Sequence, residues 1–143
     1  HNPHSSKNEK LLTALPPDLC FTCHDKSMFT KKTVHPPVRD GQCTYCHSPH
    51  ASDNPAVLTQ PLADLCATCH DGQTSGRHVM AGFSASDIHP VKGKPDPSRS
   101  GRELSCTSCH NPHASLQKKL FTNEGDTSGN LCLLCHKKIM VRP

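Results

Sequence analysis

The cysteines of this chain follow one pattern, and that pattern limits what the chain can fold into more than any other feature. All ten cysteines occur in pairs separated by two residues, and a histidine follows the second cysteine of every pair. The two thiols of such a pair lie about one helical turn apart, so a single ligand can reach both of them. The five motifs span residues 20–24, 43–47, 66–70, 106–110 and 132–136.

C-x-x-C-H is the attachment signature of c-type haem. The two thiols add to the two vinyl groups of one porphyrin, and the next histidine binds the iron from one face. Disulfides do not require a histidine after every second cysteine, and five zinc knuckles cannot pair off evenly. A thioredoxin-like site needs a βαβ setting, which the sequence does not show. We therefore predict five haem c groups. They attach through Cys20, Cys23, Cys43, Cys46, Cys66, Cys69, Cys106, Cys109, Cys132 and Cys135.

The composition agrees with a core that the side chains do not supply. Hydrophobic residues make up 33% of the 143 residues, there is no Trp, and there are 13 prolines. A typical globular chain has about 45–50% apolar residues, glycine included. We predict a multihaem cytochrome c fold, with mostly irregular coil, a few short α-helices, little or no β-structure, and a core of stacked haems.

An internal repeat organises the chain, and the tetrad H-x-P-H marks it at residues 1–4, 47–50 and 110–113. Each tetrad leads into a motif preceded by leucine. A His-Pro stretch then follows at residues 35–36 and 89–90, before the next motif. We predict one haem-packed unit with repeat one at residues 1–46, repeat two with an insert at 47–109, and a partial repeat three at 110–143. His1 has the position of a motif histidine whose cysteines are missing, and we favour a chain cut from a longer protein over a mature terminus.

Twelve histidines are enough to give every haem iron two ligands, which closes the iron to small molecules and suits electron transfer. The motif histidines are the predicted proximal ligands: His24, His47, His70, His110 and His136. The predicted distal ligands are His4, His35, His50, His89 and His113. His1 and His78 are left over.

Two assignments of distal histidines to motif histidines, called wirings below, are compatible with the repeat. In the first, each distal histidine serves the next motif along the chain: His4 with His24, His35 with His47, His50 with His70, His89 with His110, and His113 with His136. In the second, the H-x-P-H histidine serves its own repeat, so that His50 binds the iron of His24 and His113 that of His70. The second wiring leaves the iron of His136 open to His4 of an identical neighbour, which would give a head-to-tail polymer.

Regular secondary structure should be sparse. We expect short helices at residues 16–24, 61–70 and 131–138, with proline in the first turn of the first two. Residues 93–101 read as a loop, and no alternating strand pattern of useful length occurs. No apolar run approaches the roughly 20 residues of a membrane span.

The sequence resembles the multihaem c-type cytochromes with doubled C-x-x-C-H motifs. The resemblance covers nearly the whole chain and rests on the five motifs, on HSPHAS and HNPHAS, and on the HPPV and HPVK stretches. It implies bis-histidine haems packed in a continuous chain, as in periplasmic carriers, porin-bound conduits and extracellular cytochrome filaments.

We therefore expect electron transfer as a carrier or an extracellular wire, without catalysis, in the periplasm or outside the cell. The expected partners are redox proteins or identical subunits arranged head to tail. The alternative is a multihaem oxidoreductase that reduces a small oxyanion at one open haem. Nucleic-acid binding is not expected, because the formal charge of +4 comes without a basic stripe and stacking aromatics.

Overall fold

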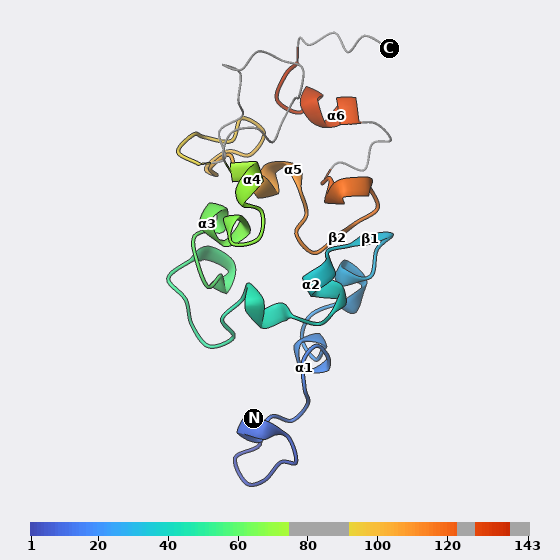
Figure 1. The fold of residues 1–143 in the computed structure, drawn as a ribbon, viewed down its shortest axis with the longest axis vertical. Coiled ribbons are helices and arrows are strands. Elements are labelled where there is room, and N and C mark those ends of the chain that lie inside the picture. The colour runs from blue at the N-terminus through green and yellow to red at the C-terminus, as the bar shows by residue number, and fades with distance from the viewer. Residues whose placement is uncertain (75–91, 123–127, 138–143) are drawn as a thin grey trace.

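The computed structural model describes residues 1–74, 92–122 and 128–137. The molecule is elongated, and the first residues form a lobe at one end while α6 lies near the other (Figure 1). Loops and turns connect very short elements. The α-helices are α1 (Asp18–Phe21), α2 (Pro36–Arg39), α3 (Leu62–Ala67), α4 (Asp71–Thr74), α5 (Cys106–Cys109) and α6 (Ser128–Leu133). The 3-10 turns are η1 (Glu9–Leu11), η2 (Lys26–Phe29), η3 (Cys43–Tyr45), η4 (Pro55–Val57) and η5 (Lys118–Leu120).

The expected coil-rich fold with few short helices is confirmed. Helices α1 and α3 lie inside the predicted ranges but are shorter, and Pro17 and Pro61 are their N-caps rather than first-turn residues. Helix α6 begins at Ser128, before the predicted start, and ends at Leu133. Helix α2 was not predicted. Its two prolines occupy the first helical positions, where a missing N–H costs nothing.

One small sheet joins distant parts of the chain. Strand β1 (Thr33–Val34) pairs antiparallel with β2 (Ala114–Ser115). The backbone N–H of His35 extends this pairing by donating to the carbonyl of His113 at 3.0 Å. The His-Pro stretch of repeat one and the H-x-P-H tetrad of repeat three are therefore held side by side.

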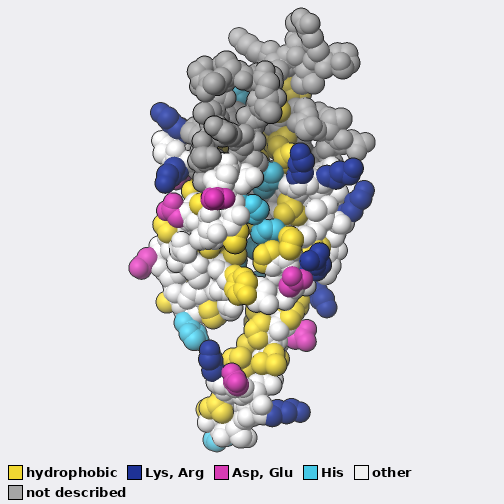
Figure 2. Space-filling view, in the orientation of Figure 1, with side chains coloured by type: hydrophobic (Ala, Val, Ile, Leu, Met, Phe, Trp, Pro, Cys, Tyr) yellow, Lys and Arg dark blue, Asp and Glu magenta, His cyan; other side chains and the backbone are white. Residues whose placement is uncertain are grey.

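The side chains build very little apolar core. Among the described residues, Ala114 is the buried hydrophobic residue, whereas leucines and Tyr45 remain well exposed. In Figure 2 histidine side chains gather along the middle of the visible face, with hydrophobic side chains beside them. None of the helices in the described ranges is both long and apolar enough to cross a bilayer.

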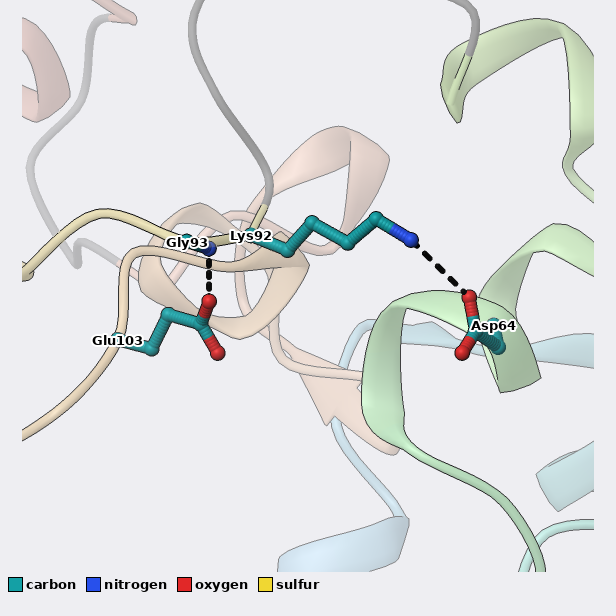
Figure 3. Close-up of polar contacts among 4 residues, drawn as sticks. All are labelled: Asp64, Lys92, Gly93 and Glu103. Carbon is teal, nitrogen blue, oxygen red and sulfur yellow. Dashed lines mark hydrogen bonds and ion pairs between the residues drawn. The ribbon is translucent and has the colours of Figure 1, made fainter.

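The predicted loop at residues 93–101 is confirmed, and polar contacts fix it on both sides (Figure 3). The Lys92 ammonium lies 3.5 Å from the Asp64 carboxylate on α3, and the backbone N–H of Gly93 donates to the Glu103 carboxylate. The Lys92–Asp64 pair is exposed and contributes little stability by itself. Together these contacts hold the entrance to the fourth motif beside the third.

Gly41 ends α2 in a way that other residues could not. Its φ is +72°, and a Cβ added there would lie 2.9 Å from Cδ of Pro17, which precedes the first motif. Glycine is the usual residue after a helix end in this left-handed conformation. Gly101 has a similar φ of +75° but nothing within 4 Å of an added Cβ.

Alanine substitutions at these two glycines distinguish the effect of backbone strain on stability from the effect of steric crowding. We expect Gly101→Ala to destabilise the protein by about 1 kcal/mol, because only the left-handed conformation penalises it. Gly41→Ala should cost more, because its Cβ also displaces Pro17. Thermal unfolding of the haem-loaded protein would measure both. Gly72→Ala in α4, where an added Cβ meets nothing, is the control, and equal losses at Gly41 and Gly101 would contradict the Pro17 contact.

Candidate haem-binding sites

The five C-x-x-C-H motifs share one backbone turn. In each motif the histidine N–H donates to the carbonyl of the first cysteine, at 2.8–3.0 Å. This i to i−4 bond forms a single helical turn that places both thiols and the imidazole close together. The turn is present whether the motif lies at a helix end, as in α3, or in a 3-10 turn, as in η3.

The histidine that opens each H-x-P-H tetrad is oriented by a hydrogen bond to the backbone. Nδ1 of His47 bonds to the carbonyl of Ala56 at 2.9 Å, and Nδ1 of His110 bonds to that of Lys119 at 2.7 Å. Nδ1 of His1 makes the same bond to the Lys10 carbonyl at 2.7 Å. A carbonyl acceptor fixes Nδ1 as the protonated nitrogen and leaves Nε2 free of its proton for a metal.

The residues that supply these carbonyls have a strained backbone conformation. The residues whose carbonyls accept these bonds, Lys10, Ala56 and Lys119, have φ of 54–56°, and the residue after each also has a positive φ. Such conformations are costly for residues other than glycine and concentrate at functional sites. The serine of the tetrad segment holds the turn in each case. The donor and acceptor pairs are Ser6 with Leu12, Ser52 with Leu58, and Ser115 with Phe121.

Histidines from different repeats face one another across nearly constant gaps. The ring centroids of His35 and His70 are 6.1 Å apart with planes at 26°. Those of His47 and His113 are 5.8 Å apart at 28°. The rings of His1 and His50 are 5.9 Å apart at 31°.

This spacing fits a haem iron. Two imidazoles that bind one iron from opposite faces have ring centroids about 6 Å apart, because each metal–nitrogen bond is about 2 Å long and each centroid lies about 1 Å behind its nitrogen. His70 and His47 each belong to a motif that would also attach the porphyrin. Both residue sets therefore fit a covalently attached haem with two histidine ligands, whose iron supplies a one-electron redox change.

The surroundings of His35 and His113, two of the predicted distal ligands, favour the neutral form of each imidazole. Burial lowers the pKa of His35, and the neighbouring His70 lowers it further. Burial also lowers the pKa of His113, with additional effects from His47, His35 and His24. An imidazole must be neutral to bind a metal. Phe29 packs edge-on against His113 with ring centroids 5.0 Å apart, which limits rotation of that ring.

The facing pairs match neither wiring predicted from the sequence. The first wiring joins His35 with His47 and His113 with His136, and the second joins His113 with His70. The structure instead places His35 against His70 and His113 against His47, because β1 and β2 hold the two distal histidines together. His4 is exposed, and no ring contact joins it to His24 among those the structure shows. The predicted ligand His89 and the left-over His78 lie outside the described residues.

The thiols of successive motifs lie near one another in chain order. Burial raises the pKa of Cys20, and the Cys43 thiol raises it further. Burial and Cys69 raise the pKa of Cys46. A hydrogen bond with Cys106 raises the pKa of Cys66.

The same relation links the fourth and fifth motifs. Burial raises the pKa of Cys109, and Cys135 is the largest electrostatic contributor. First cysteines therefore meet first cysteines, and second cysteines meet second cysteines, in alternation along the chain. Haems attached at these thiols would have adjoining edges in the order of the sequence.

Asp96 is a supporting residue that sequence reasoning missed. Its buried carboxylate accepts from the hydroxyl of Ser108, between the cysteines of the fourth motif, at 2.6 Å. It also accepts from the N–H and hydroxyl of Ser98 at 2.8 and 2.6 Å. The Asp-x-Ser spacing in a proline-rich loop is a turn signal that could have revealed the local contact, but not the bond to Ser108.

The donor groups of the described residues occur in pairs rather than in larger clusters. All ten cysteines lie in the described part of the chain, and they form no disulfide. The described residues contain no group of three or more His, Cys, Asp or Glu side chains arranged to hold a metal ion. A haem iron takes only two protein ligands, so the facing pairs are the relevant arrangement.

Repeated C-x-x-C-H turns with histidine pairs at this separation define a multihaem c-type cytochrome. Comparison with protein families gives the same result, because the doubled CXXCH motif family matches residues 1–29, 35–75 and 97–141. The chain belongs to this family, binds haem c and transfers electrons. No curated protein matches the chain.

Because the pKa of Asp96 is low in the folded protein, we expect the stability of the protein to depend on pH in the acid range. Hydrogen bonds from Ser108 and Ser98 lower the pKa of Asp96 to about 2, whereas an unfolded aspartate titrates near 3.9. The folded-state pKa is the lower one, so this stabilisation is present above about pH 4 and is lost as the pH falls toward 2. Asp96→Asn should lower the stability at pH 7, and the difference from the parent should shrink toward pH 2.

Acid unfolding followed by circular dichroism would measure this effect. Ser108→Ala removes the largest cause of the low pKa and should shift the unfolding midpoint to higher pH. Ser100→Ala, at an exposed position of the same loop, is the control. A pH-independent loss in Asp96→Asn would contradict the ionised role.

Proposed function

We propose that this protein conducts electrons along five covalently attached bis-histidine haems, arranged in the order of their motifs. It acts in the periplasm or outside the cell, as a carrier or as part of an extracellular wire, with redox proteins or identical subunits as partners. The proposal extends the family assignment by a haem number, an order and a ligand set.

The adjoining thiols of successive motifs carry this proposal. Each inner motif uses its two cysteines toward two different neighbours: in the third motif, Cys66 lies near Cys106 and Cys69 lies near Cys46. A porphyrin bonded at both positions would have one edge toward the preceding haem and another toward the following one. An uninterrupted series of neighbouring haems is what electron transfer along the molecule requires.

We assign the axial ligands of two haems from the facing pairs. His35 is the distal ligand of the haem attached at Cys66 and Cys69, opposite His70. His113 is the distal ligand of the haem attached at Cys43 and Cys46, opposite His47. By repeat equivalence His89 corresponds to His35, so it would serve the iron of His136; this assignment rests on the repeat alone.

Two-histidine ligation also argues for a carrier rather than an enzyme. An iron closed by two imidazoles has no open position for an oxyanion substrate. The reduced protein should therefore not bind carbon monoxide at the haems of His47 and His70. Rapid carbon monoxide binding at either of these haems would favour the oxidoreductase.

The ligand assignment has a direct test. His35→Ala should convert one haem from low spin to high spin, seen by electron paramagnetic resonance, and added imidazole should restore the low-spin signal. The nearby exposed Lys32→Ala is the control. In a chain that lacks the third haem through Cys66→Ala and Cys69→Ala, His35→Ala should add no high-spin signal. A new high-spin signal in that background would assign His35 to another haem.

The haem number and the assembly can be measured on one preparation. The intact mass should correspond to the chain with five haems, and fewer would contradict attachment at all ten cysteines. Electron microscopy of the same sample distinguishes the two forms of the function: discrete particles indicate a carrier, and filaments that repeat at one protomer indicate a wire.

A further inference from the structure

We propose that His1 and His50 are the two axial ligands of a further haem, beyond the five that the motifs attach. The proposal goes beyond the proposed function, which assigns no role to His1. The ligand class is an iron porphyrin held between two imidazoles.

The two rings have the same relative position as the other facing histidine pairs. Their centroids are 5.9 Å apart with planes at 31°, close to the 6.1 Å and 26° of His35 with His70 and the 5.8 Å and 28° of His47 with His113. Both rings are exposed, so a flat ligand can enter between them. Two imidazoles that merely packed together would have no reason to keep the separation that an intervening metal requires.

The turn that holds His1 is built like the turns that hold His47 and His110. Its Nδ1 bonds to the carbonyl nine residues later, as Nδ1 of His47 and His110 do. The next residue repeats the pattern: the N–H of Asn2 donates to the Leu11 carbonyl at 2.7 Å, as that of Ser48 does to Val57 at 2.8 Å. The strained residues are equivalent too, with φ of 54° at Lys10 and 56° at Ala56. The chain thus builds at His1 the support that it builds for a proximal haem ligand.

The surface next to His1 also matches that of a haem-attaching motif. Leu11 follows the carbonyl that orients His1, and its side chain is 43% exposed. Val57 follows the carbonyl that orients His47, and it is 44% exposed. A porphyrin next to each histidine would cover an apolar side chain in the same place.

The pairing gives His50 a role that the other haems leave open. The predicted wirings assigned His50 to the iron of His70 or to that of His24, but His35 faces His70 in the structure, and the ring of His50 faces that of His1. In the new arrangement the second histidine of one tetrad faces the first histidine of the preceding tetrad. His113 with His47 and His50 with His1 both follow this rule.

The porphyrin could be held in either of two ways. Each of the ten cysteines belongs to one of the five motifs, so the thiols for a covalent attachment would be other than these. Without such thiols, the iron–histidine bonds alone would hold the haem. The experiments below distinguish these cases.

The first experiment adds ferric protoporphyrin IX to the five-haem protein and follows binding by absorption spectroscopy. We expect one equivalent to bind with a low-spin, two-imidazole spectrum. His1→Ala and His50→Ala should each weaken binding by about tenfold or more, whereas Lys7→Ala, at an exposed position of the same segment, should bind normally.

The second experiment places Cys-Thr-Ser-Cys directly before His1, copying residues 106–109, and matures the protein with haem. Each thiol adds across a vinyl group, its sulfur bonding to one carbon and its hydrogen moving to the other. The mass should increase by one haem with low-spin iron, and adding His50→Ala should make that haem high spin. Ala-Thr-Ser-Ala at the same place is the control.

The outcomes separate this proposal from the proposed function. Low-spin binding in both experiments, or only in the second, supports the site and shows whether thiols are needed. No binding in either experiment, or a sixth haem insensitive to His50→Ala, overturns it. A high-spin signal from one of the original five haems in His50→Ala also overturns it, while the five-haem count and the His35 test stay valid.

Discussion

The facing of two imidazoles from different repeats is the interaction on which the rest of this structure depends. The described residues bury almost no apolar side chain, and their longest helices have six residues. Packing of this kind cannot hold a protein together, because conformational entropy opposes every ordered residue. An iron between His35 and His70, or between His47 and His113, would tie distant segments at one point, and the two thioethers next to each motif histidine would add a covalent link.

The backbone around these pairs orients the histidines and contains little regular secondary structure. The strained left-handed residues do not extend a helix or a strand; they turn a carbonyl toward a histidine. The β1–β2 pairing is only two residues long on each side, yet it sets His35 and His113 at adjacent positions. Asp96 serves the fourth motif in a similar way, because its bond to Ser108 connects a proline-rich loop to the turn between Cys106 and Cys109.

The sequence allowed the motifs, the repeat, the coil-rich fold and the approximate places of three helices to be predicted, because these depend on local spacing. It did not predict which histidine rings face each other. His35 precedes His47 in the chain, and nearest-neighbour reasoning joined them, but the antiparallel contact between residues 33–34 and 114–115 brings His113 into that region instead. A two-residue strand carries no detectable periodicity, so Thr33 and Val34 gave no signal for it. Asp96 was missed for the same reason, since its bond to Ser108 spans twelve residues of chain.

The separation of His47 from His113 along the chain also sets an order of assembly. The motif at residues 43–47 contains every residue that would attach its porphyrin, but the imidazole that faces His47 belongs to a later repeat. During assembly this iron would pass through a stage with one protein ligand, open to the surrounding solution and to stray ligands. Only the later repeat that carries His113 would close it, so the same arrangement that would protect the iron in the folded protein would leave it exposed before that repeat folds.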